Sequence, residues 1–314
     1  MPDETRNAYF EHAQDVLEAT ISLIQSGQRC ALVASLSIEG KAAREIGALA
    51  VIAQTGTMTG YLSNGCIDRD IMQHGLTAIE TRQVKHIRYG AGSPYMDLKL
   101  PCGGALELVI DPEPNLNMLC AALEALHGRD LATLSFAPEA GLVPGGQGGF
   151  HFQYAPKPAL VVAGRGAILR TTASLAASMD FELHVASPDE DDTTMLSGLR
   201  PKSIHRMTTP NAPLKLPIDA HTAVLLLFHD HEWEHTLLIN TASVQPFFMG
   251  VLGRRKTQEI RLQRLLEAGL DLKLCSTIQG PIGLVPSLCN ASLIAISALA
   301  EVTSKLPPAQ VRLL

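Results

Sequence analysis

The sequence predicts an α/β protein, in which an N-terminal α+β domain is followed by a Rossmann-like domain with a doubly wound parallel sheet. In the second half of the chain, continuous apolar segments such as 159–163, 182–186 and 222–228 alternate with helical patterns. Strands that are apolar along their whole length are typical of a parallel sheet covered by helices on both faces. The first half lacks this alternation and mixes short apolar segments with amphipathic patterns.

Composition limits the class of protein further. The 314 residues suffice for two domains, and 46% apolar against 18% charged residues allows each a core. The net charge of −6 and the absence of a long Lys/Arg run exclude a typical nucleic-acid binder. The polar N-terminus, the short apolar segment 293–302 and six scattered cysteines predict a cytoplasmic protein that does not enter a membrane.

Three regions are expected along the chain: a cysteine-containing α+β domain over 1–137, a Gly/Pro-rich connector over 138–158, and the Rossmann-like domain over 159–314. The elements expected in the first region are a helix over about 7–25, strands over 30–36 and 47–53, a helix from Cys66 to about Ile79, a strand over 105–110 and a helix over 116–127. In the third region, helices are expected to follow Gly166, Phe228 and Gly253.

Two cysteines lie in glycine-containing turns. Cys66 is at or just before a helix start, where the helix amides favour a thiolate, although Asp68 and Asp70 in the same turn oppose it. Cys102 precedes two glycines, and consecutive N–H groups there could form a small anion nest. The candidate site residues are Ser63, Asn64, Gly65 and Cys66 in the first turn, and Cys102, Gly103 and Gly104 in the second.

The alternative for either turn is a purely structural cysteine. The other four cysteines have apolar neighbours and are expected to be small core residues, namely Cys30, Cys120, Cys275 and Cys289.

Gly164 and Gly166 follow an apolar strand and resemble the start of a dinucleotide-binding loop. The fingerprint then departs twice, because Leu169 stands at the third glycine position and Ser187 stands where the ribose-binding acid is expected. NAD(P) binding is therefore doubtful, and an NAD(P)-dependent oxidoreductase is kept as an alternative function.

His231 to His235 match the zinc-peptidase pattern H-E-x-x-H, which makes a zinc hydrolase the second alternative. The pattern starts directly after a core strand, and no third ligand is evident downstream, so we predict no metal site. His229 and Asp230 are stronger candidates, because they end a parallel strand, where open α/β sheets bind their ligands.

Arg254 and Arg255 open a helix after the next strand. Basic side chains beside free helix amides favour an anion, and a solvated basic helix start is the alternative. We expect them at one edge of the sheet with the Gly164 loop and His229.

The ordered set of these motifs resembles the XdhC/CoxI family, whose members are accessory proteins of xanthine dehydrogenase and related molybdenum hydroxylases. Residues 63–66 resemble the family's S-G-G-C element, and residues 102–104 resemble its C-G-G element. The other matching segments are Gly47-Ala48 with Arg44 upstream, the Gly164 loop, His229-Asp230, residues 250–255, residues 281–284 and residues 300–302.

The resemblance implies a maturation factor rather than a metabolic enzyme. Such a protein binds the molybdenum cofactor in its molybdopterin form and protects it while a cysteine desulfurase supplies the terminal sulfido ligand. It then delivers the cofactor to the apo molybdenum hydroxylase. Cys66 and Cys102 are the residues expected to act, and a homodimer is left open. Departures from the family pattern, such as Asn64, Ala167 and Phe228, lie mostly in the Rossmann half.

Overall fold

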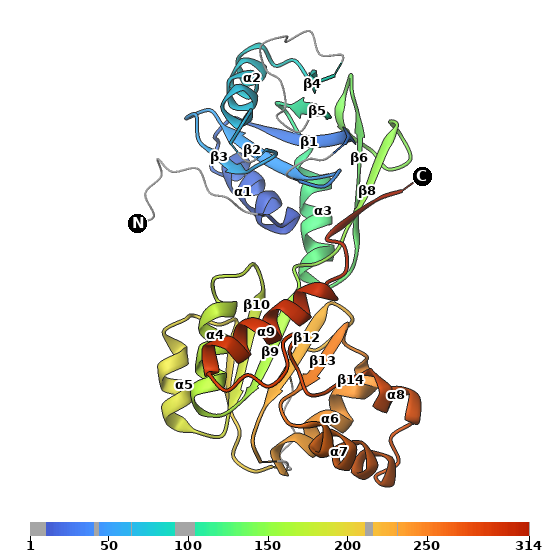
Figure 1. Ribbon diagram of the computed structural model, residues 1–314. Coiled ribbons are helices and arrows are strands. Elements are labelled where there is room, and N and C mark those ends of the chain that lie inside the picture. The colour runs from blue at the N-terminus through green and yellow to red at the C-terminus, as the bar shows by residue number, and fades with distance from the viewer. Residues whose placement is uncertain are drawn as a thin grey trace. The chain divides into compact units, whose positions relative to one another are not determined.

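The computed structural model describes residues 11–40, 44–63, 65–91, 104–210, 216–230 and 232–313 (Figure 1). The chain divides into two compact units. Unit 1 comprises Met1–Pro156 with Pro308–Leu314, and unit 2 comprises Lys157–Pro307. No helix in the described part of the chain combines the length and apolarity needed to cross a bilayer.

Unit 1 contains a five-stranded antiparallel sheet in the order β3-β2-β1-β5-β4. Its strands are β1 (Cys30–Glu39), β2 (Leu49–Ala53), β3 (Met58–Gly60), β4 (Lys85–Gly90) and β5 (Ala105–Asp111). Alternate residues of β1 enter different cores. Leu32 packs in one with α1 (Ala13–Gln25) and α3 (Leu116–His127), whereas Val33 packs in the other with α2 (Asp68–Thr81). The helices therefore cover both faces of the sheet.

A second sheet of unit 1 has the order β15-β8-β6-β7. Its strands are β6 (Ala132–Ala137), β7 (Gly141–Val143), β8 (Phe150–Tyr154) and β15 (Gln310–Leu313). The segment 138–158, expected as a connector, thus holds two paired strands. Phe152 and Tyr154 alternate with polar residues and are fully buried, which fixes β8 in the core. The end of the chain pairs with β8, so it belongs to unit 1 rather than to the Rossmann unit.

Unit 2 confirms the predicted doubly wound parallel sheet, with the order β11-β10-β9-β12-β13-β14. Its strands are β9 (Ala159–Gly164), β10 (Glu182–Ser187), β11 (Ser203–Arg206), β12 (Thr222–Leu227), β13 (Phe248–Val251) and β14 (Ile278–Gln279). If the six strands are numbered 1 to 6 in chain order, from β9 to β14, their order across the sheet is 3-2-1-4-5-6. This is the Rossmann arrangement, and its ligand crevice lies between strands 1 and 4, which are β9 and β12.

Helices cover both faces of this sheet (Figure 1). Side chains of α4 (Gly166–Ala176), α5 (Glu190–Ser197) and α9 (Ala291–Ser304) share one core. Side chains of α6 (Glu232–Val244), α7 (Arg255–Glu267) and α8 (Leu272–Thr277) share the other. The helices α4, α6 and α7 all begin at the carboxyl edge of the sheet.

Candidate functional site

The turn that carries Cys66 is folded around the carboxylate of Asp68. Asp68 Oδ1 accepts hydrogen bonds from the backbone N–H groups of Leu62 and Ser63 at 3.2 and 2.9 Å, and Oδ2 accepts one from Gly65 at 3.0 Å. Gly65 has a φ of +87°, a conformation that favours glycine. Amides that could have bound an external anion are thus bonded to the chain's own carboxylate.

Within this turn, Ser63 is buried and Cys66 is exposed as a free thiol. The Ser63 hydroxyl oxygen accepts the N–H of Ile67 at 3.1 Å, directly before α2 begins. Ser63 therefore has a structural role at the helix start, and Cys66 is the exposed thiol of the turn. Asn64 lies outside the described residues.

Cys102 and Gly103 also lie outside the described residues, whereas Gly104 is buried directly before β5. A Cβ atom on Gly90 would overlap the carbonyl oxygen of Gly104, so the backbones approach too closely there for a side chain. Tyr89, the neighbour of Gly90, donates its hydroxyl to Asp70 Oδ2 at 2.6 Å in the first turn of α2. Gly104 and the start of α2 therefore lie at one end of unit 1.

The remaining cysteines divide differently from the prediction. Cys30 and Cys275 are buried, as expected, and Cys120 is half-buried. The expectation that Cys289 is a core residue is wrong, because its side chain is exposed just before α9. Its apolar neighbours Leu284 and Val285 are themselves exposed, so local apolarity did not indicate burial.

In unit 2, the Gly164 loop and His229 lie at the same carboxyl edge, as predicted, because Leu227 of β12 is in register with Gly164 of β9. A Cβ on Gly164 would lie 2.7 Å from the carbonyl oxygen of Leu227, so glycine is required where the strands diverge. Between the two glycines, Arg165 places its guanidinium over the ring of Trp233 at 5.2 Å. This stacking, which the sequence did not reveal, joins the loop to the start of α6.

Gly166 begins α4 with a φ of +67°, and its N–H donates to Asp192 Oδ2 at 2.8 Å. The hydroxyl of Ser187 donates to the same oxygen at 3.1 Å, and Arg170 Nε donates to Oδ1. Burial alone would raise the pKa of Asp192, but these hydrogen bonds and the charge of Arg170 outweigh it and lower the pKa. The dinucleotide-like loop thus encloses an ionised side chain of the protein.

Asp230 has a structural role that the sequence analysis did not identify. Its Oδ1 accepts the N–H of Glu232 at 3.0 Å, which caps the start of α6. His229 is exposed beside it at the end of β12.

A basic group follows the neighbouring strand. Val251 of β13 is in register with Leu226 of β12, so Arg254 and His229 each lie three residues beyond a paired position at the same edge. Arg254 and Arg255 are exposed, and the first turn of α7 contains no acidic residue. The edge therefore collects positive charge beside the free amides of a helix start.

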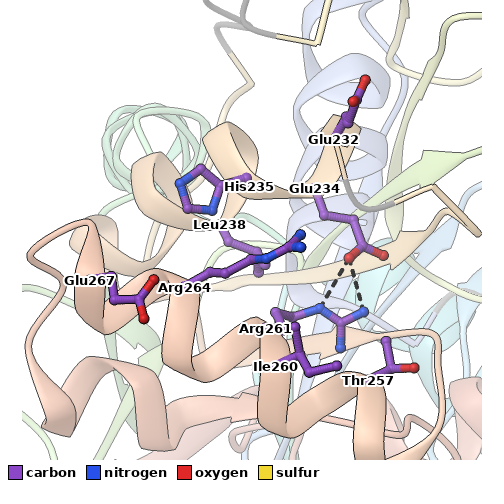
Figure 2. Close-up of a pocket in the computed structure, with 9 residues that line it drawn as sticks. All are labelled: Glu232, Glu234, His235, Leu238, Thr257, Ile260, Arg261, Arg264 and Glu267. Atoms are coloured by element: carbon purple, nitrogen blue, oxygen red, sulfur yellow. Dashed lines mark hydrogen bonds and ion pairs between the residues drawn. The ribbon is translucent and has the colours of Figure 1, made fainter.

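The H-E-x-x-H segment contributes to a groove of about 460 Å³ between α6 and α7 (Figure 2). His231 lies outside the described residues, and His235 lines the groove. On its floor, Arg261 Nε and Nη2 donate to Glu234 Oε2 at 3.0 and 2.9 Å, as Figure 2 shows. Among the described residues, no three His, Cys, Asp or Glu side chains group as metal ligands do.

The arrangement defines a two-unit protein. One unit has an exposed thiol at a helix start. The other is a Rossmann unit with basic side chains at the C-terminal ends of its strands. A family model described as the XdhC Rossmann domain matches residues 160–302, and one described as the XdhC and CoxI family matches residues 23–90. The chain belongs to the XdhC and CoxI family.

Two known proteins are similar over most of the chain. The molybdenum cofactor insertion chaperone PaoD of Escherichia coli (strain K12) is 31% identical over 298 residues, which cover 92% of this chain and 87% of PaoD. A crystal structure described as a xanthine dehydrogenase from Bacillus halodurans has a TM-score of 0.74 at 18% identity, with 92% and 94% of the two chains covered. At that identity the second likeness shows the fold alone.

Proposed function

We propose that this chain is a molybdenum cofactor chaperone. It binds the molybdopterin form of the cofactor, supports its sulfuration and delivers it to a molybdenum hydroxylase of the xanthine dehydrogenase/aldehyde oxidase type. The observation that carries the proposal is the 31% identity to a molybdenum cofactor insertion chaperone across 92% of the chain. Because the match includes both units, we assign roles to residues in each.

In unit 1, the proposed contribution is sulfur. A thiolate is a soft ligand and suits a molybdenum centre, and Cys66 is exposed on a turn that Asp68 holds in shape. Since the Asp68 carboxylate already accepts the N–H groups of the turn, the turn acts through the cysteine rather than through its amides. Cys102 is proposed as a second sulfur for the same cofactor.

In unit 2, the proposed contribution is binding of the pterin phosphate. His229, Arg254 and Arg255 are exposed at one edge, at the ends of neighbouring strands. Cationic side chains beside helix amides are the usual ligands of a phosphate group. We place the phosphate at the start of α7, beside His229, rather than at Gly166, whose N–H is bonded to Asp192.

The proposed partners follow from the same function. An apo molybdenum hydroxylase would receive the cofactor, and a cysteine desulfurase would supply the sulfido ligand, both in the cytoplasm. A homodimer remains a prediction that sedimentation of the purified chain would test.

The test is to purify the chain from cells that make the cofactor and to count molybdenum and pterin per chain. C66A and C102A are expected to retain less of both than the wild type while unfolding at the same temperature. C289A is the matched control, because Cys289 is also an exposed free thiol but belongs to unit 2 and not to a glycine turn of unit 1. Cofactor retention by C66A and C102A equal to that by C289A would contradict the role of the two sulfurs.

The same preparations separate the two alternatives. An NAD(P)-dependent oxidoreductase should retain or bind a nicotinamide dinucleotide, and a zinc hydrolase should contain stoichiometric zinc. In the structure, Asp192 bonds the amide that a dinucleotide would need, whereas His231, the first histidine of the H-E-x-x-H segment, lies outside the described residues.

A further inference from the structure

In unit 2, a protein carboxylate lies where Rossmann enzymes hold the pyrophosphate of a dinucleotide. That pyrophosphate lies at the start of the helix that follows the first strand, where free backbone N–H groups point to it. Here the helix is α4, and the N–H of its first residue, Gly166, points to Asp192 Oδ2 at 2.8 Å. The Asp192 side chain is only 1% exposed, so it fills this position from inside the protein.

The same carboxylate also contacts the residue at the second part of the dinucleotide site, where the ribose would bind. Ser187 ends β10, at the position where an acidic side chain would bind the ribose hydroxyls. Ser187 is fully buried, and its hydroxyl donates to Asp192 Oδ2 at 3.1 Å. The Asp192 carboxylate thus accepts hydrogen bonds from Gly166, at the pyrophosphate position, and from Ser187, at the ribose position.

The other carboxylate oxygen is held from α4. Arg170, one turn after Gly166, donates its Nε to Asp192 Oδ1. A phosphate arriving at Gly166 would meet an ionised carboxylate at contact distance, and like charges repel strongly in a partly buried site. Displacing Asp192 would in turn break its bonds to Gly166, Ser187 and Arg170 together, which is costly for buried polar groups.

We infer that Asp192 is a built-in replacement for the dinucleotide pyrophosphate and is the residue that excludes NAD(P) and free polyphosphates from the Gly164–Gly166 loop. The inference goes beyond the proposed chaperone function and does not depend on it. It assigns a specificity-determining role to a residue of α5, and it implies that the loop itself remains able to bind a pyrophosphate.

The experiment is calorimetric titration of the full chain with inorganic pyrophosphate and, separately, with NAD. The variants are D192A, which removes the carboxylate, and D192S, which keeps one polar atom for the buried site if D192A does not fold. D191N is the matched control, because Asp191 is the exposed neighbour in the same helix turn and its substitution also removes one negative charge.

The expected result is that wild type and D191N bind pyrophosphate equally weakly, whereas the folded Asp192 variant binds it about tenfold more tightly or better. An increase in NAD affinity should accompany it. The inference is overturned if the folded Asp192 variant binds pyrophosphate no more tightly than D191N. It is equally overturned if the wild type already binds pyrophosphate as tightly as the Asp192 variant.

Discussion

The carboxylate of Asp68 accepts a hydrogen bond from the backbone N–H of Gly65 at 3.0 Å, and this hydrogen bond helps to fix the turn that contains Cys66. Asp192 bonds the N–H of Gly166 at 2.8 Å in unit 2 in the same manner. In both units a glycine turn at a helix start has a backbone N–H bonded to a carboxylate of the chain, which comes from α2 itself in unit 1 and from α5 in unit 2. The hydrogen bonds hold both turns in shape, and Cys66 and the basic residues of α7 are exposed beside them in their respective units.

The first prediction concerns Asp68. D68A should destabilise the protein by about 1–3 kcal/mol, because the partly buried N–H groups of Leu62 and Ser63 and the exposed N–H of Gly65 lose their acceptor. It should also speed the reaction of Cys66 with a thiol reagent in the folded protein, since the turn is no longer fixed. Urea unfolding and timed labelling measure the two effects, and R69A, at the exposed neighbour, is the control. Unchanged labelling and stability in D68A would show that the turn does not depend on this carboxylate.

The second prediction is an order of thiol reactivity. Cys66 and Cys289 are exposed and should be modified first in the folded chain. Burial, with Asp111 nearby, raises the pKa of the Cys30 thiol to about 11, so it should stay unmodified at neutral pH until the protein unfolds. Mass mapping after brief alkylation gives the order, and equal modification of Cys30 and Cys289 in folded protein would contradict it.

The sequence was most informative where burial is complete. Segments such as 159–163 and 222–228 are apolar along their length because β9 and β12 are central strands covered on both faces. That pattern was enough to predict the parallel sheet and to place Gly164 and His229 at one edge. In unit 1, the start of α2 beside Cys66 could be predicted for a similar reason, since Ile71 and Ile79 recur on its buried face.

What could not be predicted depends on pairs that are far apart in sequence. Nothing near Gly166 shows that a carboxylate 26 residues later will take its N–H. The acidic residues 190–192 are ordinary for a helix start. Only their closeness in sequence to Ser187, where the ribose-binding acid is expected, hints that one of them has a second role. Likewise, β15 is a short edge strand with alternating polar residues, so its return to β8 leaves no strong signal in the sequence.

The third prediction concerns the ion pair on the floor of the α6–α7 groove. Glu234 and Arg261 are 1% and 5% exposed, so removing one partner leaves a buried charge. R261A should therefore cost about 3–5 kcal/mol of stability, whereas replacing both side chains together, as in E234L/R261M, should restore most of it. The control is R264A at the exposed rim of the groove, which should change stability little. Chemical unfolding of the wild type, R261A, E234L/R261M and R264A measures the four stabilities. A double variant as unstable as R261A would contradict the expectation.

The fourth prediction is a pH dependence. Hydrogen bonds and Arg170 outweigh burial and lower the pKa of Asp192 in the folded state, so the folded carboxyl binds its proton less readily than the unfolded one. Its stabilising contribution is complete above the unfolded pKa of about 3.9 and is lost as the pH falls through the lower folded pKa. Stability measured from neutral to acidic pH should thus fall less steeply below about pH 4 in D192N than in D191N. Parallel curves for the two variants would remove Asp192 as a source of the acid sensitivity.

The last prediction concerns the basic edge. If Arg254 and Arg255 bind the pterin phosphate, R254E/R255E should lower cofactor retention, because it replaces two attractive charges by two repulsive ones near the anion. Both side chains are exposed and the first turn of α7 has no acidic residue, so the fold should tolerate the change and the helix should gain from acids at its start. The matched control is K273E/R264E, which reverses two exposed cations of the same unit elsewhere on α7 and α8.

Molybdenum and pterin counted per chain at low and high salt provide the measurement. For the wild type, retention should fall as salt screens the cations, and for R254E/R255E it should be low throughout. Retention in R254E/R255E that equals that of K273E/R264E at low salt would place the phosphate away from this edge.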